Sequence, residues 1–401
     1  MTRRHLSLLL MCGLLPACSS EEVEVAARKT GDLTQPLAPR RSPQAEQERL
    51  CGSGQVVSST LTRAPYIQDV NDTSLVVAFS APFSPDLSVE VTTPQGDLVA
   101  HVPVEVDTPE CADGRATLKA SLTGLSPATT YCYAVANLTE RAGFVTAASV
   151  GAAAPVRFVA WGDSGENGAW QNAIFEQVQT VPFELGLLLG DVAYESGTPD
   201  ELEREYFDVY AGVLKSLPVY AVAGNHDYAT HEAQPLRQAF VLPTNGDQER
   251  WYSFNRGQVH FVGLDTERIG PQQAAWLERD LQTSRLPWTI VFGHRPPFSS
   301  GEHGGDAGFR QYFVPILERY QVDLVLSGHD HDYERFKPVH GVQYVVSGGG
   351  GRGTRPMSAT PLAAFSEAVL NFVYVEVTDS LLTLHAIDGV GREFDQAVVR
   401  H

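Results

Sequence analysis

The sequence predicts two folded domains, a small all-β sandwich over residues 57–149 and a layered α/β domain over residues 156–401. Short β-type runs separated by turns fill the first segment, which is typical of a sandwich. In the second segment, short apolar runs alternate with helical stretches, which indicates layers of helices and sheet. Late strands at Phe372–Val377 and Leu381–Ala386 favour a mixed pair of sheets. Residues 151–155 (GAAAP) form the expected linker.

The chain of 401 residues is acidic, with a formal net charge of −19. Binding to a phosphate backbone requires clustered lysine and arginine, so this charge argues against nucleic acid as a partner. A small anionic substrate can still bind at a local cationic centre such as a pair of metal ions.

Residues 1–18 have the pattern of an export signal, with a basic start, an apolar stretch and small residues around Cys18. Leu15–Cys18 resembles a bacterial lipobox, which implies a lipid anchor at Cys18 in the cell envelope and membrane contact only through that anchor. Ordinary signal cleavage, which would leave a free periplasmic or secreted protein, is the alternative. Thr2–Leu6 resembles a twin-arginine signal, so export in the folded state is an open alternative route.

Residues 19–56 are rich in Glu, Gln, Pro, Arg and Ala without apolar periodicity, which predicts a disordered tether. Of the five cysteines, two belong to the signal and leave Cys51, Cys111 and Cys132 in the body of the protein. Three cysteines allow at most one internal disulfide, whose pairing the sequence leaves open.

Within residues 57–149, the segment Leu125–Tyr131 (LSPATTY) resembles the fibronectin type III pattern. The resemblance implies a fibronectin type III-like domain with Tyr131 at its tyrosine corner. We interpret this domain as a folded spacer rather than a binding module.

Potential metal ligands follow five apolar runs of the second domain, and each run ends in a glycine. Short runs rich in Val, Leu and Ile predict strands buried on both faces, with the next polar residue at the carboxyl edge of a sheet. Open α/β sheets bind their ligands at that edge. We therefore expect one metal site fed by the residues after these runs, which are Asp163, Asp191, Asn225, His226, His294, His329 and His331.

In this order the motifs GDSG, GDVAY, GNHD, VFGH and GHDH resemble the purple acid phosphatases, a branch of the calcineurin-like metallophosphoesterases. The resemblance extends over nearly all of the second domain and implies a two-sheet β-sandwich flanked by helices. It also implies two ion positions that share Asp191. One is held by Asp163, Asp191, Tyr194 and His331, and the other by Asp191, Asn225, His294 and His329.

The donor set indicates which metals the site takes. Carboxylate, imidazole and amide oxygen ligands suit Fe, Mn and Zn better than Ca or Mg. Many relatives carry histidine where this chain has Gly165, and Tyr194 can replace that ligand as a phenolate, a hard anion that favours a trivalent ion. We therefore expect Fe(III) paired with Fe(II), Zn(II) or Mn(II), sharing one hydroxide for in-line displacement at phosphorus.

Two histidines outside the ligand set are candidate catalytic residues. His226 follows the ligand Asn225, and the resemblance implies that it contacts phosphate and leaving group, which suits a positioned imidazole. By its spacing from His294, His303 resembles the family's second outer-sphere histidine, and a surface-loop histidine without a role is the alternative.

Three further features are expected to be structural. His260 alternates with apolar residues, which predicts a packed or hydrogen-bonded strand histidine. Tyr333–Arg335 resembles a family segment beside the last motif, and we expect a structural ion pair there rather than a substrate contact. Gly348–Gly353 fits G-x-G-x-x-G but opens no helix pattern, so a flexible loop bordering the metal cleft is favoured over a nucleotide cradle.

The sequence therefore predicts a dinuclear-metal hydrolase of phosphate monoesters, of the acid phosphatase type, with a small phosphate ester as its substrate. A phosphodiesterase or nucleotidase on the same metal centre is the nearest alternative. A non-catalytic surface binding protein is the alternative of another class, and the complete set of seven ligand side chains argues against it.

Overall fold

The computed structural model describes residues 43–108 and 117–401. The predicted export signal (residues 1–18), Cys111 and the first part of the predicted tether (residues 19–42) lie outside these described residues. Within them, none of the helices combines the length and apolar composition that a membrane span needs.

The first domain consists of two four-stranded antiparallel sheets with orders β1-β2-β6-β5 and β4-β3-β7-β8. Their inner faces enclose an apolar core. The Tyr131 hydroxyl accepts a hydrogen bond from Ser126 N at 3.0 Å, as a tyrosine corner requires, while the fibronectin type III resemblance stays a prediction. The strands are β1 (Arg63–Gln68), β2 (Leu75–Ser80), β3 (Ser88–Thr92), β4 (Leu98–Pro103), β5 (Glu105–Thr108), β6 (Thr117–Leu122), β7 (Thr130–Val135) and β8 (Ala142–Val145).

The structure differs from the predicted tether at residues 43–56. Pro43–Cys51 forms helix α1, which packs against β8, and Cys51 is disulfide-bonded to Cys132 of β7. Gly54 N then donates to Arg141 O at 2.9 Å. The helix has few apolar residues, so a covalent bond and backbone hydrogen bonds, rather than an apolar stripe, hold it in place.

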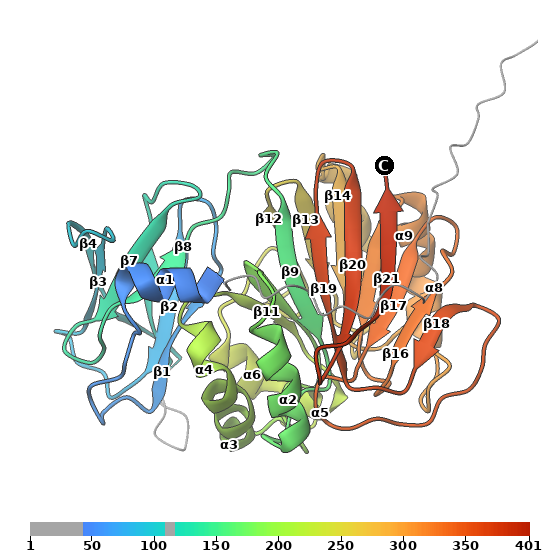
Figure 1. The fold of residues 1–401 in the computed structure, drawn as a ribbon, viewed down its shortest axis with the longest axis horizontal. Helices are drawn as coiled ribbons and strands as arrows, with labels where there is room; N and C mark the ends of the chain where they lie inside the picture. Colours follow the sequence, from blue (N-terminus) through green and yellow to red (C-terminus); the bar gives the residue numbers. More distant parts are fainter. Residues whose placement is uncertain (1–42, 109–116) are drawn as a thin grey trace, which may run out of the picture.

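The second domain has two sheets flanked by helices (Figure 1). The six-stranded sheet has the order β11-β10-β9-β19-β20-β21, and the seven-stranded sheet the order β12-β13-β14-β15-β17-β16-β18. Strands β9, β10 and β11 are parallel, as are β13, β14, β15 and β17, and the remaining pairs are antiparallel. The predicted mixed pair of sheets is therefore confirmed.

The strands of the second domain are β9 (Val156–Trp161), β10 (Leu185–Leu189), β11 (Val219–Val222), β12 (Tyr252–Arg256), β13 (Val259–Gly263), β14 (Trp288–Phe292), β15 (Leu324–Ser327), β16 (Tyr333–Phe336), β17 (Gln343–Ser347), β18 (Ala363–Glu367), β19 (Asn371–Val377), β20 (Leu381–Asp388) and β21 (Glu393–Arg400). Its helices are α2 (Ala169–Val178), α3 (Pro199–Leu202), the π-helix Glu203–Phe207, α4 (Asp208–Leu214), α5 (Asn225–Tyr228), the 3-10 helix His231–Ala233, α6 (Gln234–Ala239), α7 (Pro271–Thr283), α8 (Ala307–Tyr312) and α9 (Val314–Arg319). Helices α2 and α4 share a core with the six-stranded sheet, and α7, α8 and α9 share one with the seven-stranded sheet.

The sandwich packs directly on the second domain (Figure 1). Tyr66 and Ala78 belong to the same apolar core as the strands and helices of the second domain. A buried ion pair joins Arg63 to Glu203 across this boundary. The predicted spacer is therefore docked rather than held at a distance.

Candidate metal centre

The seven predicted ligand side chains converge at the carboxyl ends of five strands. Three of these strands, β9, β10 and β11, lie in the six-stranded sheet, and β14 and β15 lie in the other. Asn225 is half-buried, and the other six ligands are buried. The site therefore lies where the two sheets meet, and neither sheet supplies it alone.

The backbone at the site is strained at three of the predicted ligands. Asp163, Asp191 and His329 have φ values of 58°, 50° and 73°. Non-glycine residues in this left-handed region cost on the order of 1–3 kcal/mol and concentrate at functional sites. At Gly224 a β-carbon would lie 2.1 Å from Asp191 Oδ1, so only glycine lets the β11 exit approach this carboxylate.

One group of donor atoms surrounds the Tyr194 hydroxyl. This oxygen lies 3.2 Å from Asp163 Oδ1 and 3.2 Å from Asp191 Oδ2. His331 Nε2 lies 3.5 Å from Asp163 Oδ1. Ligand atoms about 2.0–2.2 Å from one ion lie about 3 Å from one another, so these four residues fit a single ion.

A second group surrounds His294 Nε2. This nitrogen lies 3.4 Å from Asp191 Oδ2, 3.1 Å from Asn225 Oδ1 and 3.2 Å from His329 Nδ1. Asp191, His294 and His329 form a cluster of buried groups that could hold a metal ion. Since Asp191 Oδ2 belongs to both groups, the residues present fit two ions that share one carboxylate.

Neighbouring polar groups fix the orientation of these ligands. Leu189 O lies 2.8 Å from His294 Nδ1 and accepts its proton, which leaves Nε2 free for a metal. His226 N donates to Asp191 Oδ1 at 2.9 Å, and His329 N donates to Asp163 Oδ2 at 2.7 Å. Each carboxylate therefore uses one oxygen to bind backbone and keeps the other for the site.

In the metal-free protein, burial and neighbouring charges shift the pKa values of three candidate ligands. Burial opposes charge on Asp191, but the adjacent His294 imidazolium lowers the pKa of Asp191 below its ordinary value. Burial disfavours charge on His294 as well, but Asp191 raises the pKa of His294 to about 10. Burial, together with the Asp163 and Asp191 carboxylates, raises the pKa of the Tyr194 phenol. Metal ions that bind here would displace the protons of His294 and Tyr194, so their affinity would depend on pH.

The two candidate catalytic histidines both contact this centre. The His226 ring lies beside the Tyr194 ring, with centroids 4.4 Å apart, and His226 Nε2 lies 4.0 Å from Asp191 Oδ2. The His303 ring stacks on His329, with centroids 4.3 Å apart. Both imidazoles therefore border the space above the two ion positions.

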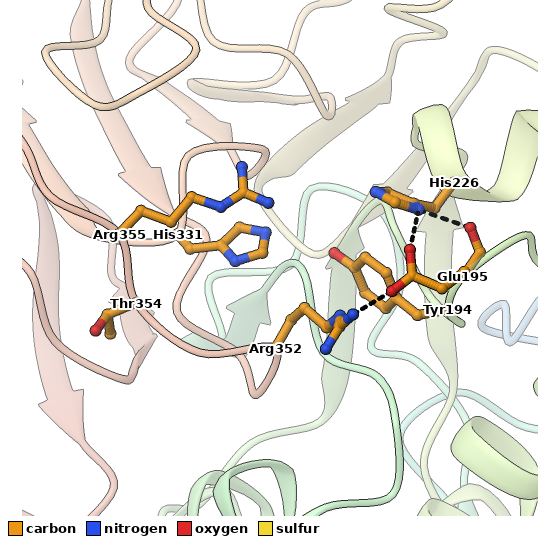
Figure 2. A pocket seen from close by; sticks show the side chains of 7 residues that line it. All are labelled: Tyr194, Glu195, His226, His331, Arg352, Thr354 and Arg355. Atoms are coloured by element: carbon orange, nitrogen blue, oxygen red, sulfur yellow. Dashed lines mark hydrogen bonds and ion pairs between the residues drawn. The ribbon is translucent and has the colours of Figure 1, made fainter.

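The sequence did not indicate three charged residues that lie near the site. Glu195, Arg352 and Arg355 line a cavity of about 160 Å³ together with Tyr194, His226, His331 and Thr354 (Figure 2). Both arginines come from the glycine-rich segment after β17 and its continuation, where the sequence indicated only a loop at the cleft. Neither arginine belongs to a sequence motif that could have identified it.

The remaining structural expectations hold with one refinement. His260 is buried, and its two nitrogens lie 2.8 Å from Asn255 Oδ1 and 2.8 Å from Asp280 Oδ2, which confirms a hydrogen-bonded strand histidine. The ion pair expected at Tyr333–Arg335 joins Arg335 to Asp395 at 2.6 Å, with no contribution from Glu334.

Comparison with known proteins shows which family the second domain resembles. Residues 157–333 match the model of the calcineurin-like phosphoesterase family. This part of the second domain therefore resembles the calcineurin-like phosphoesterases, and the two sheets form the β-sandwich expected of them.

Within this class the chain resembles the purple acid phosphatases. It is 27% identical over 290 residues to purple acid phosphatase 21 of Arabidopsis thaliana, covering 64% of each protein. It is 26% identical over 292 residues to tartrate-resistant acid phosphatase type 5 of Oryctolagus cuniculus, covering 60% of this chain and 90% of the relative. The chain spans about half the length of other curated relatives that it matches.

A solved structure extends the likeness to the whole fold. The purple acid phosphatase from yellow lupin (Lupinus luteus) seeds gives a TM-score of 0.74 at 19% identity, covering 84% of this chain and 74% of that chain. These comparisons confirm the predicted fold class and the resemblance to purple acid phosphatases.

Proposed function

We propose that the protein is a dinuclear-metal hydrolase of small phosphate monoesters, of the acid phosphatase type. The proposal rests on the position of Asp191 Oδ2, which lies 3.2 Å from the Tyr194 hydroxyl and 3.4 Å from His294 Nε2. One buried carboxylate is thereby placed to serve two ions. When bound, such a pair supplies positive charge for phosphate and activates water for in-line attack. The acid phosphatases among the relatives support the monoester as substrate.

The two donor groups differ in charge, and this supports a mixed metal pair. Around the first ion stand two carboxylates and a phenol that can ionise, which suits Fe(III). Around the second stand the shared carboxylate, one amide oxygen and two imidazoles, which suit Fe(II), Zn(II) or Mn(II). The first group is Asp163, Asp191, Tyr194 and His331, and the second is Asp191, Asn225, His294 and His329.

His226 is the proposed proton donor to the leaving group. Its Nδ1 lies 2.7 Å from Glu195 O, which fixes the tautomer by accepting the Nδ1 proton (Figure 2). In the imidazolium form, Nε2 carries the proton that the departing oxygen needs. A surface position on α5 leaves this ring half-buried and accessible to substrate.

We further propose that the chain works outside the cytoplasm. The export signal predicted at residues 1–18 supports this location, as does the disulfide between Cys51 and Cys132, because such bonds persist in oxidising compartments. A lipid anchor at Cys18 would be its attachment to the membrane.

The proposal is tested with the purified mature chain, a monoester (p-nitrophenyl phosphate) and a diester (bis-p-nitrophenyl phosphate). We expect faster release from the monoester, loss of activity on chelation and recovery on adding Fe and Zn. Preferential cleavage of the diester would establish the phosphodiesterase alternative. Protein that binds two ions and cleaves neither ester would contradict a catalytic role.

A further inference from the structure

Tyr194 is held at the candidate metal centre by its backbone as well as by its hydroxyl. Strand β10 ends at Leu189, so the strand that leads to Asp191 does not extend to Tyr194. Instead, Tyr194 N donates a hydrogen bond of 2.8 Å to Glu205 Oε2. Glu205 is 2% exposed and Tyr194 is 4% exposed, so solvent does not compete for this bond. The Glu205 carboxylate therefore fixes the main chain from which the phenol projects.

Glu205 lies in the π-helix Glu203–Phe207, and its own position is fixed on two sides. Its second carboxylate oxygen accepts a hydrogen bond from Arg204, and its main-chain oxygen accepts one from Gln171 Nε2 at 2.7 Å. The buried Gln171 side chain also accepts a hydrogen bond from Asn167 N at 2.7 Å. Single π-helical turns are rare and frequently occur at functional sites. Side chain and main chain of Glu205 are thus both restrained.

The sandwich contacts both ends of this π-helix through Arg63 of β1. Arg63 Nε donates to Glu203 Oε1 at 2.7 Å, and the guanidinium carbon lies 4.0 Å from the centre of the Phe207 ring. Arg63 and Glu203 are both buried. Helix α4, which continues the π-helix, lies beside the sandwich (Figure 1). Because breaking a buried ion pair from one side is costly, Arg63 restrains the π-helix firmly.

We propose that Glu205 is a positioning residue for Tyr194, and that the sandwich, through Arg63, fixes the π-helix on which Glu205 lies. The inference rests on the proposed function, because Tyr194 must be a ligand of Fe(III). Hydrogen bonds from outside the ligand set orient a ligand and reduce the freedom that it loses when it binds a metal. The sandwich would thereby contribute to the metal centre without supplying a ligand.

The visible band of the iron-loaded protein and its affinity for Fe(III) test the role of Glu205. Both are measured on the purified mature chain loaded with Fe and Zn, the affinity by competition with citrate. Glu205→Leu leaves Tyr194 N without its acceptor, so it should shift or weaken the band and lower the affinity about tenfold or more. Glu205→Gln keeps an acceptor oxygen and should restore both. A Glu205→Leu protein with the wild-type band and affinity would overturn the assignment.

Arg63→Met tests the contribution of the sandwich, also where Glu205→Leu does not fold. It removes the hydrogen bonds to Glu203 and should lower the affinity for Fe(III) by a smaller factor than Glu205→Leu. Arg63→Lys, which keeps the charge without the planar fork, is a milder second variant with the same expected direction. Because Arg63 acts through Glu205, adding Arg63→Met to Glu205→Leu should cause no further loss. Unchanged affinity in both Arg63 variants, or a full additional loss in the double variant, would refute this role of the sandwich.

Tyr133→Phe is the matched control at the same domain boundary. The Tyr133 hydroxyl donates to Lys215 O at 2.9 Å, and Lys215 follows α4 rather than lying in the π-helix. This variant loses one hydrogen bond between the domains, so the band and the affinity for Fe(III) should stay as in the wild type. A loss equal to that of Arg63→Met would show that docking in general, and not the π-helix, affects the metal centre.

Hydrolysis of p-nitrophenyl phosphate separates this inference from the proposed function. Wild-type protein that cleaves the ester, with the same band and affinity as Glu205→Leu, would refute only the positioning role. Wild-type protein that shows the band but cleaves no ester would refute the proposed function, while a changed band in Glu205→Leu would still support positioning. Iron-loaded wild type without a visible band would refute the positioning role as well, because Tyr194 would not be a ligand.

Discussion

Asp191→Asn is the substitution that most sharply probes the two-ion site. The amide keeps the shape of the side chain and can still accept the 2.9 Å hydrogen bond from His226 N, but it removes the negative charge. Asp191 is only 2% exposed, and its Oδ2 lies 3.4 Å from His294 Nε2. Both proposed ion positions share this oxygen, so the variant should bind fewer than one ion per chain, where the wild type should bind two.

The same change should destabilise the metal-free protein. Asp191 raises the pKa of His294 to about 10, so at neutral pH the two form a buried ion pair. Breaking such a pair from one side costs about 3–5 kcal/mol. Because folding raises the pKa of His294 from 6.5, the contribution of its imidazolium to the free energy of unfolding is complete below about pH 6.5 and is lost as pH rises toward about 10. Asp191→Asn should remove this dependence of the free energy of unfolding on pH, as measured by urea unfolding across this range.

Asp280→Asn supplies the matched control. Asp280 forms a carboxylate–imidazole pair with His260 at 2.8 Å in the same domain, with neither residue in the ligand set. This variant should keep two ions, as measured by elemental analysis after dialysis. An Asp191→Asn protein that retains two ions, or an Asp280→Asn protein that loses as many, would refute the shared-carboxylate reasoning.

Three further substitutions test other parts of the site. His226→Ala should keep both ions and lower kcat about a hundredfold or more, since it removes a proton donor outside the ligand set; unchanged kcat would exclude that role. A Tyr194 phenolate bound to Fe(III) should give the oxidised, iron-loaded protein a visible charge-transfer band, which Tyr194→Phe should abolish; a band that persists would show that the phenolate is not a ligand. Burial raises the pKa of Asp332 from 3.8 to about 8, and the nearby Glu334 and Asp330 charges add to the rise. The folded protein therefore keeps this proton to a higher pH than the unfolded chain does, so the free energy of unfolding of the metal-free protein should fall as pH rises between these values. Asp332→Asn should remove that fall in urea titrations, and an equal slope in both proteins would contradict it.

The candidate ligands could be identified from sequence because each one depends on a local pattern. An apolar run predicts a buried strand, and the polar residue after its glycine is placed at the sheet edge by the strand itself. Asp163, Asp191 and His294 follow β9, β10 and β14 in this way. Tyr194 lacks such a position and was found only through the family resemblance.

The parts that the sequence missed depend on contacts between distant segments. Arg355 reaches the cavity because its backbone bonds to His331 O and its side chain to His303, and no periodicity encodes either contact. Helix α1 was missed for a related reason, since the bond between Cys51 and Cys132 spans 81 residues. Composition describes what a segment can form alone, whereas these segments are fixed by their partners.

A metal titration of the metal-free protein tests the proposed two-ion site most directly. Bound metal and phosphate release from p-nitrophenyl phosphate are measured on the same samples as Fe and then Zn are added. Activity should appear with the second ion and reach its maximum at two ions per chain, since Asp191 is placed to serve both positions. Full activity at one ion per chain, or activity in the metal-free protein, would contradict it.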